Sequence, residues 1–268
     1  MSGFSADWLS LREPYDARAR SPKVLAAVAT GFAKFPALSI VDLACGTGST
    51  LRALAPHLPA QQNWKLVDND LGLLARAAKA SHPHAKVTTI AIDLVRDLEI
   101  VLDGHLDLVT TSALLDLVSD TWLERLATEV AARRLPLYAA LSYDGRIAFE
   151  PSDPFDGAII AAVNDHQHRD KGFGPALGPT AATSTIAQFE TVGYSVVHAA
   201  ADWVMEQQDR DMQAALLDGW AGAAREVGQQ SPADISAWLT RRRAALSHGQ
   251  STIRVGHIDV FATPIALR

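Results

Sequence analysis

The stretch Val41-Asp42-Leu43-Ala44-Cys45-Gly46-Thr47-Gly48-Ser49-Thr50 joins an apolar run to a glycine turn and then to a segment of helical character. Glycine has no Cβ, so a turn built on Gly46 and Gly48 lets a ligand approach the backbone closely. The first N–H groups of the helix that follows are unpaired and suit an anionic group. Because Asp42 would repel a pyrophosphate, the stretch predicts a ligand that carries a cation as well as a carboxylate.

The residues from Asp42 to Gly48 resemble the first motif of the class I methyltransferases that use S-adenosylmethionine (SAM). The resemblance has landmarks over residues 36–145. It implies a Rossmann-like α/β fold with a doubly wound, seven-stranded and mostly parallel sheet, SAM as the cofactor and methyl transfer as the activity. Within the motif it implies cofactor contacts at Asp42, Ala44, Gly46 and Gly48. A dinucleotide-binding fold requires G-x-G-x-x-G, but Leu51 stands where the third glycine belongs.

Apolar segments of strand and helix character alternate along the chain, which predicts a parallel sheet covered on both faces. Ligands then bind at the carboxyl ends of the strands. Strands are expected at 38–43, 64–68, 86–92, 106–111, 135–143, 194–204 and 252–263. Helices are expected within 7–33 and at 49–58, 71–80, 122–130, 185–192, 207–227 and 231–246. Residues 164–180 are rich in glycine, proline and charge, and are expected to form a long loop.

We expect one methyltransferase domain over residues 1–268. Within it, residues 1–35 form N-terminal helices that act as a lid, and residues 36–145 form the SAM-binding core. Residues 146–268 form the acceptor side, with the long loop, a helical insertion before the last strand and the final strands. The helical insertion is expected to cover the substrate site.

Composition restricts the partners of the chain. The formal net charge is −6, whereas nucleic-acid binders show a basic patch. The best basic cluster, Arg241-Arg242-Arg243, is interpreted as the solvated side of a helix, and no nucleic acid is expected. No apolar run approaches the ~18 residues of a membrane span, and the N-terminus has no signal-peptide character. With a single cysteine, Cys45, these features favour a cytoplasmic protein that acts on a small molecule.

The resemblance assigns further cofactor contacts to residues that follow the predicted strands. Asp68 is expected to accept both ribose hydroxyls, with Asn69 and Asp70 as alternatives in register. Asp93 and the backbone of Leu94 are expected to meet the adenine ring, with Asp97 as a weaker competitor. Ser112 is expected beneath the methyl group.

The N-terminal segment has two interpretations. As a lid, it places the ring of Tyr15 over the cofactor, and it pairs Arg12 or Arg18 with the methionyl carboxylate. As a charged surface helix, it has no role in cofactor binding.

Methyl transfer from a sulfonium requires alignment of donor and acceptor, and a hydroxyl or ammonium acceptor must also lose a proton. His166 or His168 is the candidate base, oriented by Asp170, with Arg169 or Lys171 binding an acidic acceptor. Tyr143, at the end of the fifth strand, is a further candidate. Asp116 faces the acceptor or is merely solvated.

Other interpretations of the same residues remain open. His166, His168 and Asp170 have the spacing of metal ligands, although no metal is expected, and the segment is also typical of a solvated loop. For the whole chain, the preferred acceptor is a small-molecule oxygen or nitrogen. The alternatives are a SAM-binding subunit without catalysis, with a regulatory or assembly role, and a methyltransferase of protein side chains.

Overall fold

The computed structural model describes residues 4–79, 83 and 85–265, and in these residues it forms one mixed sheet around β1 (Leu38–Leu43). The strands after β1 are β2 (Gln62–Asp68), β3 (Ala85–Ala91), β4 (Leu108–Ser112), β5 (Leu137–Glu150), β6 (Tyr194–Ala200), β7 (Trp203–Met205) and β8 (Thr252–Pro264). Their order is β3-β2-β1-β4-β5-β8-β6, and β7 also pairs with β8. Pairing is parallel from β3 to β5 and antiparallel wherever β8 takes part. The predicted doubly wound, mostly parallel α/β fold is confirmed.

The described part of the sheet has eight strands rather than seven, because residues 194–204 are divided into β6 and β7. Both strands keep one register on β8, with Ala200 opposite Ile258 and Trp203 opposite Val255. Between them the Asp202 side chain accepts the backbone N–H of His257 at 3.4 Å. A side chain thus replaces one backbone partner, and the strand is interrupted there.

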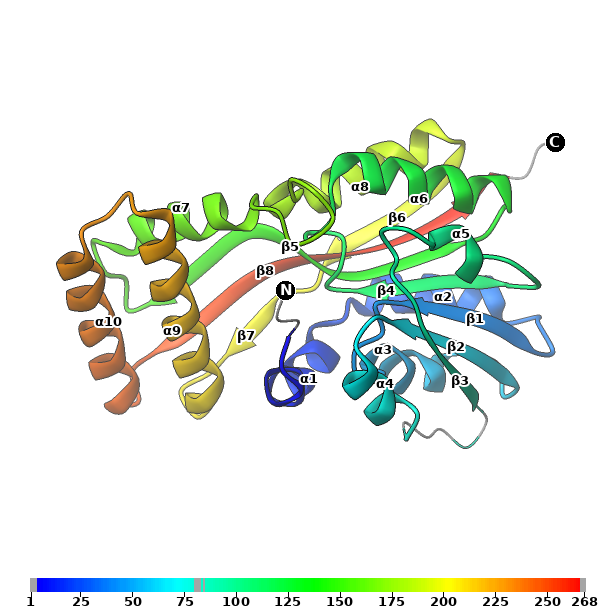
Figure 1. Cartoon of the computed structure of the whole chain (residues 1–268). Helices are drawn as coiled ribbons and strands as arrows, with labels where there is room; N and C mark the ends of the chain where they lie inside the picture. Colours follow the sequence, from blue (N-terminus) through cyan, green and yellow to red (C-terminus); the bar gives the residue numbers. More distant parts are fainter. Residues whose placement is uncertain (1–3, 80–82, 84, 266–268) are drawn as a thin grey trace.

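Helices cover both faces of the sheet (Figure 1). They are α1 (Ala6–Ala19), α2 (Pro22–Phe32), α3 (Ser49–Leu54), α4 (Leu71–Ala77), α5 (Leu98–Val101), α6 (Asp120–Ala132), α7 (Asp156–Gln167), α8 (Ala181–Thr191), α9 (Arg210–Val227) and α10 (Pro232–Ser247). Two short 3₁₀ turns are η1 (Ala55–His57) and η2 (Gly178–Thr180). One core lies between the sheet and α5, α6 and α8, and a second lies between the sheet and α2, α3 and α4. No helix in the described ranges is long and apolar enough to cross a bilayer.

A third core forms where β5 and β8 continue past the rest of the sheet (Figure 1). Together with β7, these extensions form an arm on which α7, α9 and α10 pack. We call this arm and its helices the distal lobe. It consists of residues 143–150 of β5, residues 252–257 of β8, the strand β7, and the helices α7, α9 and α10. The helical pair expected before the last strand is confirmed as α9 and α10.

Helix α7 was not predicted, and its last residues, 164–167, overlap the expected loop. The stretch has weak amphipathic character, and its first residues lack a capping side chain. Ile159, Ala162 and Val163 are nevertheless buried in the distal lobe. Tertiary burial therefore stabilises a helix that the local sequence does not mark.

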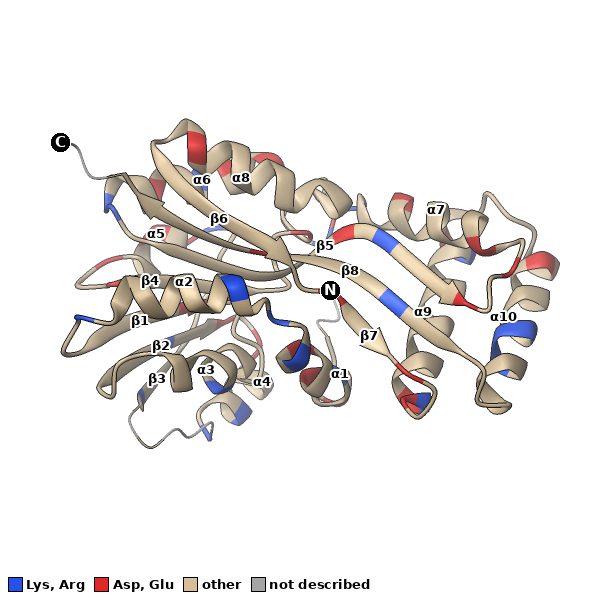
Figure 2. Cartoon of the chain, turned by 180° about the vertical axis from the view of Figure 1, so that it is seen from behind, with Lys and Arg blue, Asp and Glu red and all other residues tan. Residues whose placement is uncertain are grey.

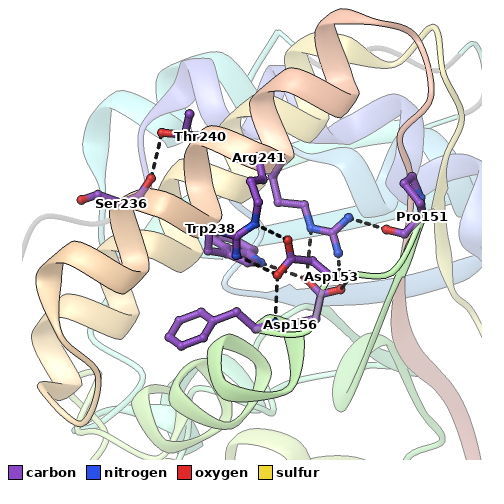
Figure 3. A network of polar contacts seen from close by, with 9 residues as sticks. Pro151, Asp153, Asp156, Ser236, Trp238, Thr240 and Arg241 are labelled. Carbon is purple, nitrogen blue, oxygen red and sulfur yellow. Dashed lines mark hydrogen bonds and ion pairs between the residues drawn. The ribbon is translucent and has the colours of Figure 1, made fainter.

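The basic cluster Arg241-Arg242-Arg243 is not simply solvated, because Arg242 is only 2% exposed. Its guanidinium forms an ion pair with Asp156 of α7 and lies 4.3 Å from the ring of Phe149. Arg241 pairs with Asp153, as Figure 3 shows, and Arg243 pairs with Asp218. Basic and acidic residues also lie near one another over the rear of the distal lobe (Figure 2). Since each of the three arginines has an acidic partner, the cluster does not provide a basic face.

Candidate active site

The glycine turn follows β1 directly and contains three residues in the left-handed backbone region. Their φ angles are 53° at Ala44, 54° at Gly46 and 82° at Gly48, which begins α3. A Cβ on Gly46 would lie 3.2 Å from Cδ1 of Leu9, so α1 packs closely against the turn. The expected turn is confirmed, and Leu9 of α1 packs against it. Residues with side chains would be strained at Gly46 and Gly48.

Asp68, at the end of β2, faces the glycine turn. One carboxylate oxygen accepts the backbone N–H of Gly46 at 2.9 Å, and the other accepts that of Asp70 at 3.0 Å. Asn69 is exposed, and the carboxylate of Asp70 accepts two N–H groups at the start of α4. Of the three candidates in register, Asp68 is therefore the one that contacts the glycine turn.

Asp42, at the centre of the sheet, is fully buried next to β4. Its Oδ1 accepts the hydroxyl of Thr110 at 2.8 Å, and its Oδ2 has no partner. Burial raises the pKa of Asp42 to about 7, against the opposing effects of the Thr110 hydrogen bond and the charge of Arg20. An unpartnered buried carboxylate oxygen is costly, so this arrangement suits a ligand that brings a cation. The ammonium end of SAM fits this requirement, and its sulfonium supplies the methyl group when it is bound.

Asp93 and Leu94 follow the end of β3. Asp93 is half-buried, and its carboxylate accepts the N–H of Val95 at 2.9 Å. Leu94 is buried, and its carbonyl accepts the indole N–H of Trp122 at 2.9 Å. The N–H of Ile92 also donates to the carbonyl of Asp68 at 3.0 Å, so the turn after β3 lies beside the end of β2, on the side where the resemblance places the adenine ring.

Arg20, which the sequence did not single out, contacts the end of β4. It is buried between α1 and α2, with one nitrogen 3.3 Å from the Ser112 hydroxyl and another 3.2 Å from the Tyr138 hydroxyl. Its Nε has no partner. Asp259 of β8 holds this region by accepting N–H groups of Ser21 and Leu141. The only local signal at Arg20 is its place before the Ser21-Pro22 helix start.

The predicted lid residues of α1 have mixed placements. Arg12 is buried and donates to Asp16 at 2.9 Å, with its guanidinium 5.2 Å from the Trp203 ring. The Tyr15 hydroxyl donates to Asp209 at 3.0 Å. Tyr15 and Arg18 line a surface hollow of about 480 Å³ beside β7. The structure therefore brings Arg12 towards the acceptor side but does not bring Tyr15 or Arg18 to the glycine turn.

The expected His–Asp arrangement in the loop is wrong. Asp170 accepts the backbone N–H groups of Gly172 and Gly174, and no hydrogen bond joins it to either histidine. His166 lies in the last turn of α7, 3.0 Å from Glu226 of α9, and His168 contacts the carbonyl of Ala176. No group of three or more metal-ligating side chains occurs among the residues with described placement. Asp170 therefore stabilises a local turn of the loop through these glycine N–H groups. The spacing of residues in the sequence does not reveal this contact.

Three further polar residues, Asp116, Tyr143 and Lys171, lie beyond the end of β4 on the side of Arg12. Asp116 is buried, and the charges of Arg12 and Lys171 and the backbone of Tyr143 lie close enough to affect its carboxyl. Asp116 is therefore not solvated. Tyr143 donates to Asn164 at 2.7 Å, and burial raises the pKa of Tyr143. Tyr143 and Lys171 were expected on the acceptor side.

His257 of β8 lies beside this group and was not predicted to have a role. Its ring centroid lies 6.1 Å from that of Tyr143 and 4.7 Å from that of Trp203. Burial and the charge of Arg12 lower the pKa of His257 to about 3, so the imidazole is neutral at pH 7. Because the Val255 carbonyl can only accept, Nδ1 donates to it at 3.1 Å.

The roles of His166 and His168 can be tested separately from cofactor binding. Alanine at either position should leave the affinity for S-adenosylhomocysteine, the demethylated product of SAM, within about twofold of wild type by calorimetry, since neither ring contacts the glycine turn. The exposed His166–Glu226 pair should contribute less than about 1 kcal/mol to the free energy of unfolding. A loss of affinity in either variant would mean that the segment shapes the cofactor site.

Comparison with known proteins agrees with this geometry. Residues 40–135 match the family model described as "Methyltransferase domain". No curated protein matches the chain. Among solved structures, the cyclopropane synthase MmaA2 of Mycobacterium tuberculosis is 12% identical, with a TM-score of 0.50 over 97% of this chain and 95% of that chain. The YcgJ protein of Bacillus subtilis is 13% identical, with a TM-score of 0.49 over 91% and 98%.

The family model covers β1 to α6, the segment that contains the glycine turn, Asp42, Asp68 and Asp93. The structural similarity to the cyclopropane synthase extends the shared fold over nearly the whole chain. Over residues 40–135, this chain is therefore similar to a methyltransferase domain, in agreement with the resemblance carried by the glycine turn.

Proposed function

We propose that the chain transfers the methyl group of SAM to an oxygen or nitrogen atom of a small molecule. The observation that supports a small acceptor is the enclosure of the acceptor side. Arg12 of α1, Asp116 and Tyr143 are all buried, and the charges of Arg12 and Lys171 both act on Asp116. An acceptor that reaches these groups must fit under α1, which favours a metabolite over a folded protein or a nucleic acid.

In this proposal, acids at three neighbouring strand ends hold the donor. Asp42 pairs with the ammonium group, Asp68 accepts from the ribose hydroxyls, and Asp93 meets the adenine amino group. Arg20 and Arg12 supply positive charge for the methionyl carboxylate. The Ser112 hydroxyl, fixed by Arg20, lies below the methyl group.

The acceptor side combines both signs of charge. Lys171 attracts an acidic group, while Asp116 and Tyr143 offer polar contacts to the reacting atom. An acidic metabolite with a hydroxyl or amino group suits this combination.

Transfer of a labelled methyl group tests the proposal. Protein incubated with [methyl-³H]SAM and a cell extract, separated into metabolite and protein fractions, should place the label in the metabolite fraction. The Asp68→Ala variant, which should bind SAM poorly, serves as the matched control and should transfer little. Label on the protein fraction would favour a protein methyltransferase. No transfer despite SAM binding would favour a regulatory or assembly subunit.

A further inference from the structure

Asp116 has features that the cofactor site does not use. It follows Ser112 by four residues, in the turn after β4, and is only 6% exposed. Its Oδ1 is buried and has no hydrogen-bond partner. A buried carboxylate oxygen without a partner is costly, and such groups are typical of binding and catalytic sites.

Backbone hydrogen bonds hold the turn that contains Asp116 in place. Its backbone carbonyl accepts the N–H of Gly178 at 2.9 Å, and Leu177 donates to the carbonyl of Val118 at 2.8 Å. These bonds tie the turn to the segment after the loop. The positive charges of Arg12 on α1 and Lys171 on the loop act on the carboxyl.

Other candidate proton acceptors nearby are already engaged or unsuited. The Tyr143 hydroxyl donates to Asn164, and burial raises the pKa of Tyr143. His166 contacts Glu226, and His168 contacts the Ala176 carbonyl. His257 is neutral, but its low pKa makes it a weak base.

We propose that Asp116 receives the proton of the methyl acceptor, and that the acceptor atom is accordingly a hydroxyl oxygen or an ammonium nitrogen. This inference rests on the proposed methyl transfer. The acceptor atom forms a bond to the methyl carbon, and the electron pair of the carbon–sulfur bond stays on sulfur. The proton of a hydroxyl passes to Oδ1 of Asp116 during this step, whereas an ammonium gives up its proton before it.

The titration of Asp116 is consistent with this role. Burial raises the pKa of Asp116 to about 6, and the charges of Arg12 and Lys171 limit the rise. The carboxylate is therefore ionised at pH 7.5 and able to take a proton close to neutrality. As the pH falls through 6, the group becomes protonated and loses this ability.

The test uses sinefungin, a SAM analogue with an amine in place of the transferable methyl group, so the acceptor itself need not be known. At pH 7.5, calorimetry on the wild type and the Asp116→Asn variant gives the ratio of the dissociation constants of sinefungin and S-adenosylhomocysteine. If Asp116 faces the methyl position, the substitution should reduce the preference for sinefungin by about tenfold, because a charge-assisted hydrogen bond is lost. The affinity for S-adenosylhomocysteine should stay within about twofold. In the wild type the preference should also decline below pH 6, and in the variant it should not.

The matched control is Asp103→Asn, an exposed aspartate before the start of β4, at the opposite edge of the sheet. It should change neither dissociation constant. Equal changes for both ligands in Asp116→Asn, or a lower melting temperature with an unchanged ratio, would assign Asp116 a structural role and overturn the inference. If the wild type binds neither ligand, the proposed function itself fails.

Discussion

Replacing Asp68 with alanine is expected to weaken the binding of S-adenosylhomocysteine by about 100-fold. Two effects add to one another. The variant loses the carboxylate that we assign to the two ribose hydroxyls, and each charge-assisted hydrogen bond contributes about 1.5–3 kcal/mol. It also loses the 2.9 Å contact that holds the N–H of Gly46 in the glycine turn. Isothermal titration calorimetry measures the change directly.

The matched control is Asp70→Ala, two residues further along the same turn. Asp70 accepts the N–H groups of Gly72 and Leu73 and caps α4, so its loss should cost about 1 kcal/mol of stability. Its affinity for S-adenosylhomocysteine should remain near that of the wild type. Asp68→Asn, which keeps one acceptor oxygen without the charge, should fall between wild type and Asp68→Ala. Equal affinities for Asp68→Ala and Asp70→Ala would remove Asp68 from the cofactor site.

The cofactor half of the fold could be predicted because its signals are local. The left-handed backbone at Gly46 and Gly48 is marked by the glycines themselves, and Asp42 and Asp68 lie at the ends of short, largely apolar strands. A parallel sheet brings such ends together whatever the details of packing. The placement of Asp42 and Asp68 beside one turn follows from that topology.

Side-chain contacts between distant segments could not be predicted in this way, on the donor side or on the acceptor side. Arg20 meets Tyr138 and Ser112 over separations of 118 and 92 residues, and no periodicity marks these pairings. Asp170 illustrates the opposite failure. The sequence places it near two histidines, but its Oδ1 accepts the backbone N–H groups of Gly172 and Gly174, and no hydrogen bond joins it to either ring.

The distal lobe contains a buried ion pair between Asp156 and Arg242, the middle residue of the arginine cluster at 241–243. Asp156 begins α7, where it accepts the indole N–H of Trp238 at 2.9 Å and the backbone N–H of Asp153 at 2.7 Å (Figure 3). Arg242 of α10 pairs with both carboxylate oxygens and also donates to the carbonyl of Pro151. One carboxylate thus links the two outer helices to the end of β5.

Asp156→Ala is therefore expected to lower the free energy of unfolding by about 4 kcal/mol and the melting temperature by roughly 10 °C. The reason is that Arg242 remains buried without its counter-charge and the Trp238 N–H loses its acceptor. Calorimetry or circular dichroism gives the melting temperature. Below that temperature, the affinity for S-adenosylhomocysteine should be unchanged, because the glycine turn and the distal lobe rest on different cores.

Two further variants distinguish the stability lost through an unpaired buried charge from the stability lost when any one ion pair is removed. Asp218→Ala breaks the exposed ion pair between α9 and Arg243, which lies next to Arg242 on α10. It should lower the free energy of unfolding by less than about 1 kcal/mol. The double variant Asp156→Leu with Arg242→Met removes both charges while retaining apolar volume, and it should recover most of the stability lost in Asp156→Ala. If the double variant unfolds at the same temperature as the single one, the unpaired guanidinium is not the cause. The loss would then arise from the helix start and the Trp238 contact alone.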